Sequence, residues 1–222
     1  MGANVEELTN TIVAGLRDSS NDSWPEQSIW GAILEAEKVI TNFRPDATAT
    51  DADFTCAAGH RQDLSTMPGI TPLRFLDAQH NGTTEVPGRT IRVVDQGTLN
   101  RLKPDWRAET QGNAVRQVMY DERFPLVFLT YPPIAAGTVI HIGFSREPAD
   151  YGNVDGNTET TVSGVFSPMI LECALYRLLG HDVEGSVNVS RSQQHWNNFQ
   201  AMMGIKIEAD KVFGPKNPEH KR

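Results

Sequence analysis

The amino-acid sequence predicts an α+β protein, and three observations lead to this prediction. Amphipathic helical patterns occupy the first 45 residues and return near residue 165. Between them, short apolar runs alternate with Gly, Pro and Thr, as is typical of strands joined by turns. The last 18 residues contain Pro215, Pro218 and many charges, and favour no packed element.

We therefore expect a helical bundle formed by the N- and C-terminal helices, with an inserted antiparallel β domain and an extended C-terminal arm. The bundle would comprise residues 1–45 and 165–204. The β-rich domain would comprise residues 46–164, and the arm residues 205–222.

The first two helices are predicted from periodicity and capping signals. In residues 4–19, five apolar residues recur at intervals of three and four: Val5, Leu8, Ile12, Val13 and Leu16. In the second helix, Ser23 is placed to cap the N-terminus, with Glu26 three residues later to close a capping box. Pro45 ends this helix near residue 43, because the residue before a proline disfavours helical geometry.

Six strands are predicted in the middle of the chain, and two of them flank a Pro- and Gly-containing spacer at 132–138. This spacing favours a long hairpin between residues 126–131 and 139–145. Asp95 is placed to cap a short helix that ends at Leu102. The predicted strands are 54–57, 73–77, 90–94, 115–120, 126–131 and 139–144.

Two further helices are predicted after the β-rich region. Ser167 and Pro168 begin a helix that reaches residue 179, and apolar spacing predicts a last helix over residues 186–203. Gly204 is well placed to end that helix. The arm that follows has two open interpretations, a frayed terminus or a segment that becomes ordered on a neighbouring subunit.

Composition favours an ordinary soluble globular protein, with 222 residues of which 39% are apolar and 22% charged. No run of apolar residues is long enough for a membrane span, so no membrane partner is expected. The N-terminus lacks the basic and apolar regions of a signal peptide. Two cysteines, Cys56 and Cys173, are too few for a disulfide framework and are interpreted as reduced thiols.

Charge is distributed unevenly along the chain. Residues 1–60 contain ten acidic and three basic residues, a net charge of −7 against −8 for the whole chain. The last twelve residues contain four basic residues and one acidic residue, a net charge of +3. An acidic first quarter argues against a phosphate-binding surface in that segment. A solvated helix face followed by a basic tail explains the same pattern without any function.

The sequence contains no Walker A loop, no G-x-G-x-x-G, no G-x-S-x-G and no H-E-x-x-H motif. Cys56 and His60 could form a thiolate–imidazole pair, but a buried cysteine beside a turn histidine is the simpler interpretation. The polar loop at 153–159 lacks the EF-hand spacing, and His181 and His195 lack metal-ligand spacing. We therefore expect no enzyme activity, no catalytic residue, no metal site and no cofactor. Trp106 is interpreted as a core residue.

Six segments in order resemble the head-to-tail adaptor, or connector, proteins of short-tailed bacteriophages. The resemblance covers residues 23–204 and depends on the order and spacing of the segments, since none of them is diagnostic alone. The segments are FRPD at 43–46, AGHRQDL at 58–64, GRTI at 88–91, PDW at 104–106, YPP at 131–133 and ALYRL at 174–178.

The resemblance implies a structural virion protein at the head–tail junction, assembled in the cytoplasm of the bacterial host. Similar proteins form a ring, as a rule a dodecamer, between the portal protein and a tail tube or nozzle protein. Double-stranded DNA passes through the ring for packaging, retention and ejection, without sequence-specific binding. The resemblance implies a portal-binding arm and an acidic channel wall. The candidate arm residues are Lys206, Lys211, Phe213, Lys216, Lys221 and Arg222, and the candidate channel-facing acids are Glu6, Glu7, Glu35 and Glu37.

Three alternatives stay open on the sequence. The first is a tail-tube or tail-completion protein that binds lower in the tail. The second is a small-ligand or carbohydrate-binding module in which the β domain displays Trp106 and Tyr151. The third is a cysteine hydrolase that uses Cys56 and His60.

Overall fold

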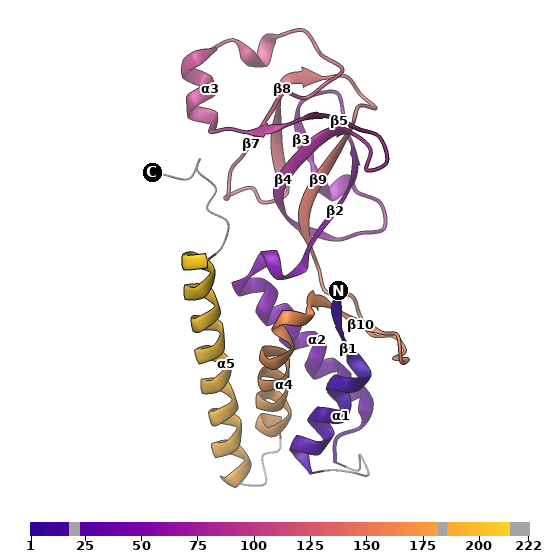
Figure 1. Ribbon diagram of the computed structural model, residues 1–222, viewed down its shortest axis with the longest axis vertical. Coiled ribbons are helices and arrows are strands. Elements are labelled where there is room, and N and C mark those ends of the chain that lie inside the picture. The colour runs from indigo at the N-terminus through magenta and orange to yellow at the C-terminus, as the bar shows by residue number, and fades with distance from the viewer. Residues whose placement is uncertain (18–22, 182–185, 214–222) are drawn as a thin grey trace. The chain divides into compact units, whose positions relative to one another are not determined.

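A computed structural model of the chain describes residues 1–17, 23–181 and 186–213, and it is an α+β structure as predicted (Figure 1). The chain divides into two compact units. One consists of Met1–Ile40 and Pro148–Arg222, and the other of Thr41–Glu147. We call them the helical unit and the β unit and describe each by itself.

The helical unit contains α1 (Val5–Leu16), most of α2 (Glu26–Phe43), α4 (Ser167–His181) and α5 (Ser186–Phe213). The side chain of Asn4 caps α1 by accepting a hydrogen bond from the Glu7 amide at 3.0 Å. Two short strands, β1 (Gly2–Asn4) and β10 (Glu159–Ser163), pair antiparallel. Neither was predicted, because short polar segments such as ETTVS carry no apolar alternation.

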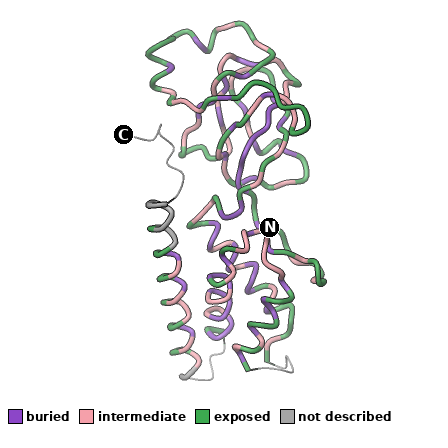
Figure 2. The backbone as a smooth tube through the Cα atoms, in the orientation of Figure 1, coloured by how far each residue is buried: buried purple, intermediate pink, exposed green. Residues whose placement is uncertain are grey.

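The core of the helical unit follows the apolar periods of its helices. Buried residues lie along α2 and α4, where they form one face of each helix (Figure 2). On α5, the ring of Phe199 is 1% exposed and stacks with the ring of Trp196 at 5.2 Å between centroids. Trp196 in turn packs against Tyr176 of α4 at 4.9 Å. The apolar periods therefore predicted both C-terminal helices and the residues at which they begin.

The prediction that the last helix ends at Gly204 is wrong. Helix α5 continues through Gly204 to Phe213. A glycine inside a helix costs only about 1 kcal/mol relative to alanine, and the first proline beyond it is Pro215. The segment from 205 to 213 is consequently helical and not extended. Residues 214–222 of the predicted arm lie outside the described part of the chain.

The β unit is built from two four-stranded sheets. The first has the order β2 (Ala49–Thr55), β9 (Val139–Arg146), β4 (Pro72–Gly82) and β5 (Pro87–Thr90). The second has the order β3 (Gly59–Asp63), β8 (Val127–Ile134), β7 (Gln117–Tyr120) and β6 (Arg92–Val93). The described strand pairs are antiparallel except β6 with β7.

The two sheets share one apolar core, to which both contribute phenylalanines. Phe75 of β4 stacks on Phe128 of β8 at 4.5 Å, and Phe54 of β2 meets the same ring edge-on at 5.6 Å. The core is closed by β-branched and aliphatic residues from both sheets. This packing of two apolar sheet faces makes the unit a small β-sandwich.

The predicted hairpin between residues 126–131 and 139–145 does not form. Strands β8 and β9 belong to different sheets. The connection bonds instead to the end of β2, because the amide of Cys56 donates to the carbonyl of Thr138 and the amide of Gly137 donates to the carbonyl of Cys56. An alternating apolar pattern shows that a strand has a buried face but does not say which strand it pairs with.

The short helix after Asp95 is confirmed as α3 (Gln96–Leu102). The carboxylate of Asp95 accepts a hydrogen bond from the Thr98 amide at 2.8 Å, which is the predicted cap. Trp106 follows in a short 3-10 turn and is fully buried. Its indole N–H donates to the side-chain oxygen of Asn100 at 2.8 Å, so the prediction of a core tryptophan is confirmed.

Candidate interaction surfaces

The described part of the chain contains residues suited to binding a partner surface but no assembled catalytic group. Cys56 is buried, and burial raises the pKa of its thiol to about 12. His60 packs edge-on against the ring of Trp106 at 5.7 Å. Within residues 1–17, 23–181 and 186–213, no three His, Cys, Asp or Glu side chains could together hold a metal ion. No described helix is both long and apolar enough to cross a membrane.

The polar loop before β10 is an internally bonded turn. The carboxylate of Asp155 accepts hydrogen bonds from the Asn157 amide at 3.0 Å and the Thr158 hydroxyl at 2.8 Å. These bonds lower the pKa of Asp155. His195 binds Glu172 at 2.8 Å on the neighbouring helix, which orients its ring within the helical unit.

The predicted channel-facing acids fall into two groups. Glu6 and Glu7 are exposed in the first turn of α1, and Glu35 is partly exposed on α2, where it lies 3.2 Å from Arg177. Glu37 is fully buried. Its assignment to a channel wall is wrong, because a side chain without solvent exposure cannot line a channel.

Glu37 instead connects α2 with the segment that precedes α4. Its carboxylate accepts a hydrogen bond from the amide of Val162 at 2.8 Å and another from the hydroxyl of Tyr151. Burial, followed by the charge of Glu37, raises the pKa of Tyr151 well above its ordinary value. Tyr151 is therefore a half-buried structural contact and Trp106 is fully buried, so the two residues do not form the exposed aromatic surface that a carbohydrate-binding module would require.

The predicted portal-binding residues lie at the end of the chain. Lys206, Lys211 and Phe213 belong to the last turns of α5, although their side chains are outside the described part. Lys216, Lys221 and Arg222 are outside the described residues altogether. Ile205, on the same part of α5, is 72% exposed.

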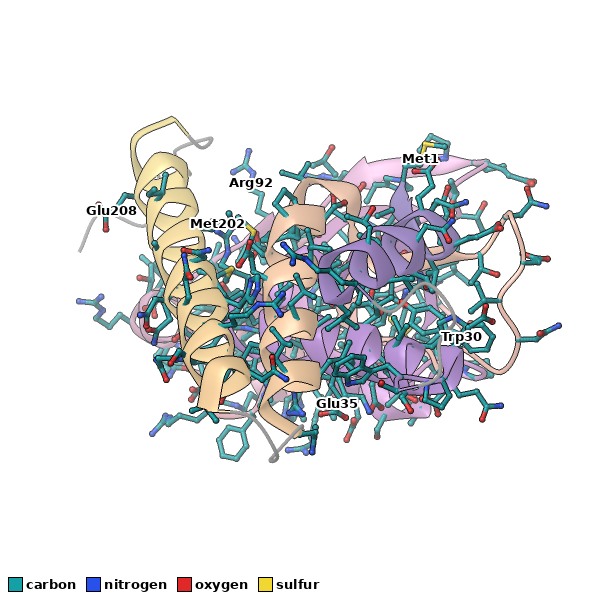
Figure 3. All side chains as sticks on the ribbon, turned by 90° about the horizontal axis from the view of Figure 1, so that it is seen from below. Met1, Trp30, Glu35, Arg92, Met202 and Glu208 are labelled. Atoms are coloured by element: carbon teal, nitrogen blue, oxygen red, sulfur yellow. The ribbon has the colours of Figure 1, made fainter. Side chains whose placement is uncertain are left out.

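Two adjoining hollows flank the exposed side of α2, and Figure 3 labels Trp30 and Glu35 on this helix. Their cavity volumes are about 700 and 250 Å³. Gly31 and Leu34 line both of them. The larger hollow also contains Arg177 and His181 of α4, and the smaller contains Tyr151. This surface is concave and lined by both apolar and polar side chains, which suits a protruding side chain of a partner.

Gly31 gives this surface a testable property. It lies within α2, is exposed, and a Cβ atom added to it would meet nothing within 4 Å. We expect Gly31→Ala to raise the free energy of unfolding by about 0.5–1 kcal/mol, because alanine loses less backbone entropy in a helix. Urea denaturation measures the change. Gly15→Ala is the matched control: its Cβ would meet the Leu175 side chain at 3.4 Å, so its gain should be smaller. A destabilised Gly31→Ala chain would contradict the open geometry.

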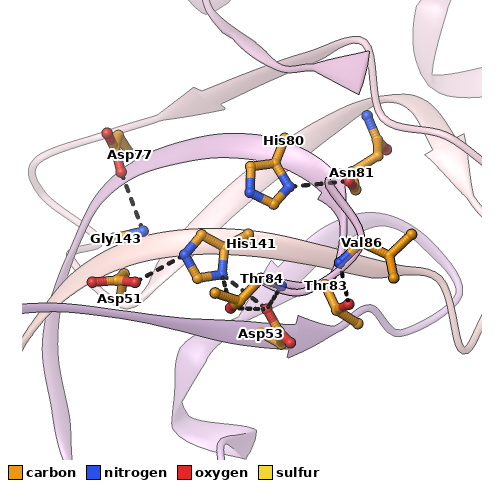
Figure 4. Close-up of polar contacts among 10 residues, drawn as sticks. All are labelled: Asp51, Asp53, Asp77, His80, Asn81, Thr83, Thr84, Val86, His141 and Gly143. Atoms are coloured by element: carbon orange, nitrogen blue, oxygen red, sulfur yellow. Dashed lines mark hydrogen bonds and ion pairs between the residues drawn. The ribbon is translucent and has the colours of Figure 1, made fainter. Parts of the chain in front are cut away.

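A histidine held between two carboxylates lies in the β unit (Figure 4). The Nδ1 of His141 is 2.8 Å from Oδ1 of Asp53, and its Nε2 is 2.9 Å from Oδ2 of Asp51. Both acids belong to the edge strand β2, whereas the imidazole is almost fully buried on β9. Both ring nitrogens can donate only if the imidazole is protonated, so the geometry favours the cation.

The same cluster attaches the turn between β4 and β5. The amide of Thr84 donates to Oδ1 of Asp53 at 2.9 Å, and its hydroxyl lies 3.1 Å from Nδ1 of His141. His80 stacks on His141 at 5.0 Å between ring centroids. This cluster was not predicted from the sequence. The only signals were alternating polar residues in TDADFT and VIHIGFS, and they become meaningful only once β2 and β9 are known to pair.

A family model described as SU10 adaptor protein matches residues 3–219, which is nearly the whole chain. The chain belongs to this family and is a structural adaptor protein of bacteriophages, as its resemblance to head-to-tail adaptors implied. The comparison with curated proteins found no match.

Proposed function

We propose that the protein forms a ring between the portal and the tail of a phage particle, with a central channel for DNA. Membership of the SU10 adaptor protein family over residues 3–219 is the observation that carries this proposal. A ring arises when one surface of a subunit binds a different surface of the next and the rotation closes. By analogy with similar adaptors the ring would have twelve copies, and it would assemble in the host cytoplasm before taking its place in the virion.

The C-terminal part of α5 and the residues after it are the proposed portal-binding segment. The sequence after α5 contains Lys216, Lys221 and Arg222. The last twelve residues therefore have a positive net charge, opposite in sign to that of the first 60 residues. A basic segment suits an acidic partner surface. Glu6, Glu7 and Glu35 remain the proposed channel-facing acids, because they are exposed or partly exposed. Acids on a channel wall repel phosphate, so DNA would slide without binding.

Electron microscopy of the protein mixed with the portal protein from the same genome tests the proposal. The expected result is a ring stacked coaxially on the portal. A chain truncated after residue 204 should lose this complex, whereas Glu7→Gln should still form it. A folded monomer that never binds the portal would contradict the proposal and favour a tail-completion protein. If the truncated chain still bound the portal, the proposed role of the C-terminal segment would be wrong and the proposed ring would be unaffected.

A further inference from the structure

Three exposed arginines lie at one end of the strand order of the β unit. Arg89 is on β5, Arg92 is on β6, and Arg116 directly precedes β7. The amide of Arg92 donates to the carbonyl of Arg116 at 3.2 Å, so their backbones are adjacent. All three residues are exposed, and none of their guanidinium groups makes an ion pair or hydrogen bond within the described residues. We call them the arginine edge.

Four other basic residues of the same unit have acidic partners, whereas Arg61, Arg101, Arg107 and Arg146 pair with no acid within the described residues. The arginine edge differs from these residues because its three arginines lie together on neighbouring segments. No acid occurs in residues 86–94 or 114–118, the two segments that contain the arginine edge. Two guanidinium groups on the outer strands β5 and β6, and a third just before β7, form a local cationic surface in a chain whose net charge is −8. The paired residues are Arg44 with Asp46, Arg74 with Glu122, Lys103 with Glu109, and Arg123 with Asp121.

The opposite end of the strand order carries acids. In the first sheet β5 is the last strand and β2 is the first, and β2 presents Asp51 and Asp53. Each acid contacts His141 through one oxygen, Oδ2 of Asp51 and Oδ1 of Asp53, and their side chains are 59% and 36% exposed. His141 fixes the two carboxylates and neutralises one charge, so they keep a net charge of −1.

We propose that the arginine edge of one copy binds the β2 edge of a second copy, with Arg92 and Arg116 facing Asp51 and Asp53. The two surfaces are different and complementary, so the contact is head-to-tail and repeats from copy to copy. It also explains how copies with a net charge of −8 associate, because local opposite charges offset their mutual repulsion. This inference rests on the proposed ring and identifies one contact within it.

A charge-swap series on the full chain mixed with its portal tests the contact. Arg92→Glu with Arg116→Glu should weaken ring assembly about tenfold or more, and raised salt should weaken the wild type in the same direction. Adding Asp51→Arg to the same chain should restore assembly in part, since one of the two facing positions on β2 then carries a charge opposite to the introduced glutamates. Arg101→Glu with Arg146→Glu makes the same change of charge elsewhere on the β unit and should assemble as the wild type does.

A cysteine pair provides a second, geometric measurement. Arg92→Cys with Asp51→Cys in one chain should give a ladder of disulfide-linked oligomers on a non-reducing gel, whereas either change alone should not. The natural cysteines are both buried and give little background. Normal rings from the Arg92→Glu, Arg116→Glu chain would overturn this contact and leave the proposed function intact. If that chain assembled normally but no longer bound a DNA duplex, the contact between copies would also be overturned, and the arginine edge would be a phosphate-binding surface. Absence of any ring from the wild type would overturn both.

Discussion

Glu37→Ala is expected to lower the free energy of unfolding of the helical unit by about 2–5 kcal/mol. The change removes an acceptor from two groups, the amide of Val162 and the hydroxyl of Tyr151. Each group left without a partner in the interior costs about 1–3 kcal/mol. Few single substitutions in the helical unit should cost more, because Glu37 is fully buried and links segments more than 100 positions apart in sequence.

Denaturation followed by tryptophan fluorescence measures this effect, since Trp24, Trp30 and Trp196 belong to the helical unit. Glu35→Ala is the matched control two positions earlier on the same helix. Glu35 is 44% exposed in its ion pair with Arg177, and such pairs contribute about 0–1 kcal/mol. Tyr151→Phe removes the hydrogen bond from the Tyr151 hydroxyl but leaves the bond from the Val162 amide, and it should give an intermediate result. Equal, small effects for Glu35→Ala and Glu37→Ala would show that the buried bonds do not stabilise the unit.

Glu37 also illustrates which features of this chain were predictable. On the sequence, Glu35 and Glu37 are both acids on one predicted helix, and both were assigned to a channel wall. Their positions on α2 place Glu35 towards solvent and Glu37 against β10 and the segment before it. That segment is polar and distant in sequence, so nothing local indicated that it would cover Glu37. A burial assignment for a polar residue requires the tertiary contacts.

The helices were predictable because their signals are local. The apolar periods of α1, α2 and α4 and the Asp95 cap of α3 each depend on residues within a few turns of one another. Strand pairing depends on residues far apart in sequence. For this reason the sequence did not indicate that β8 and β9 belong to different sheets. Strand β3 was missed because its buried residue is Gln62, whose amide bonds to the backbone of Ala57.

The class of protein was predictable for a different reason. The six short segments that resemble head-to-tail adaptors are spread over the whole fold, from the end of α2 to the middle of α4. A family can be identified from their order even when strand pairing is wrong, because order along the chain needs no tertiary contact. The candidate surfaces could not be identified in this way. The arginine edge and the His141 cluster exist only after the sheets have formed.

The stability of the β unit is expected to depend on pH through His141, and the expected dependence follows from its two carboxylate partners. Burial of the ring lowers the pKa of His141, but the hydrogen bonds and charges of Asp53 and Asp51 outweigh it, and the pKa is raised above its ordinary value. The hydrogen bond from His141 lowers the pKa of Asp53. The imidazolium of His141 and the carboxylate of Asp53 therefore stabilise each other's charged forms in the folded state.

The stability contributed by the histidine and the stability contributed by the aspartate change with pH in opposite directions. A raised histidine pKa stabilises the fold fully below the unfolded value of about 6.5, and this stability is lost as pH rises through the folded pKa. A lowered aspartate pKa stabilises the fold above about 3.9, and this stability is lost as pH falls through the folded pKa. Both contributions are present together between about pH 4 and 6.5. The difference in Tm between the wild type and His141→Gln should therefore be largest there and shrink towards pH 9.

Near pH 6, His141→Gln should cost about 2–4 kcal/mol, because two charge-assisted hydrogen bonds of about 1.5–3 kcal/mol each are replaced by weaker ones. Thermal unfolding of both chains from pH 4 to 9 measures the cost, and NMR titration of the His141 ring reports its pKa directly. Asp51→Asn with Asp53→Asn keeps the ring but removes the charges, so it should abolish most of the pH dependence. A difference that stays constant from pH 5 to 9 would mean that His141 acts by packing alone. In that case the carboxylates of β2 would not be fixed by a cation, and both would keep their full charge towards the arginine edge of the next copy.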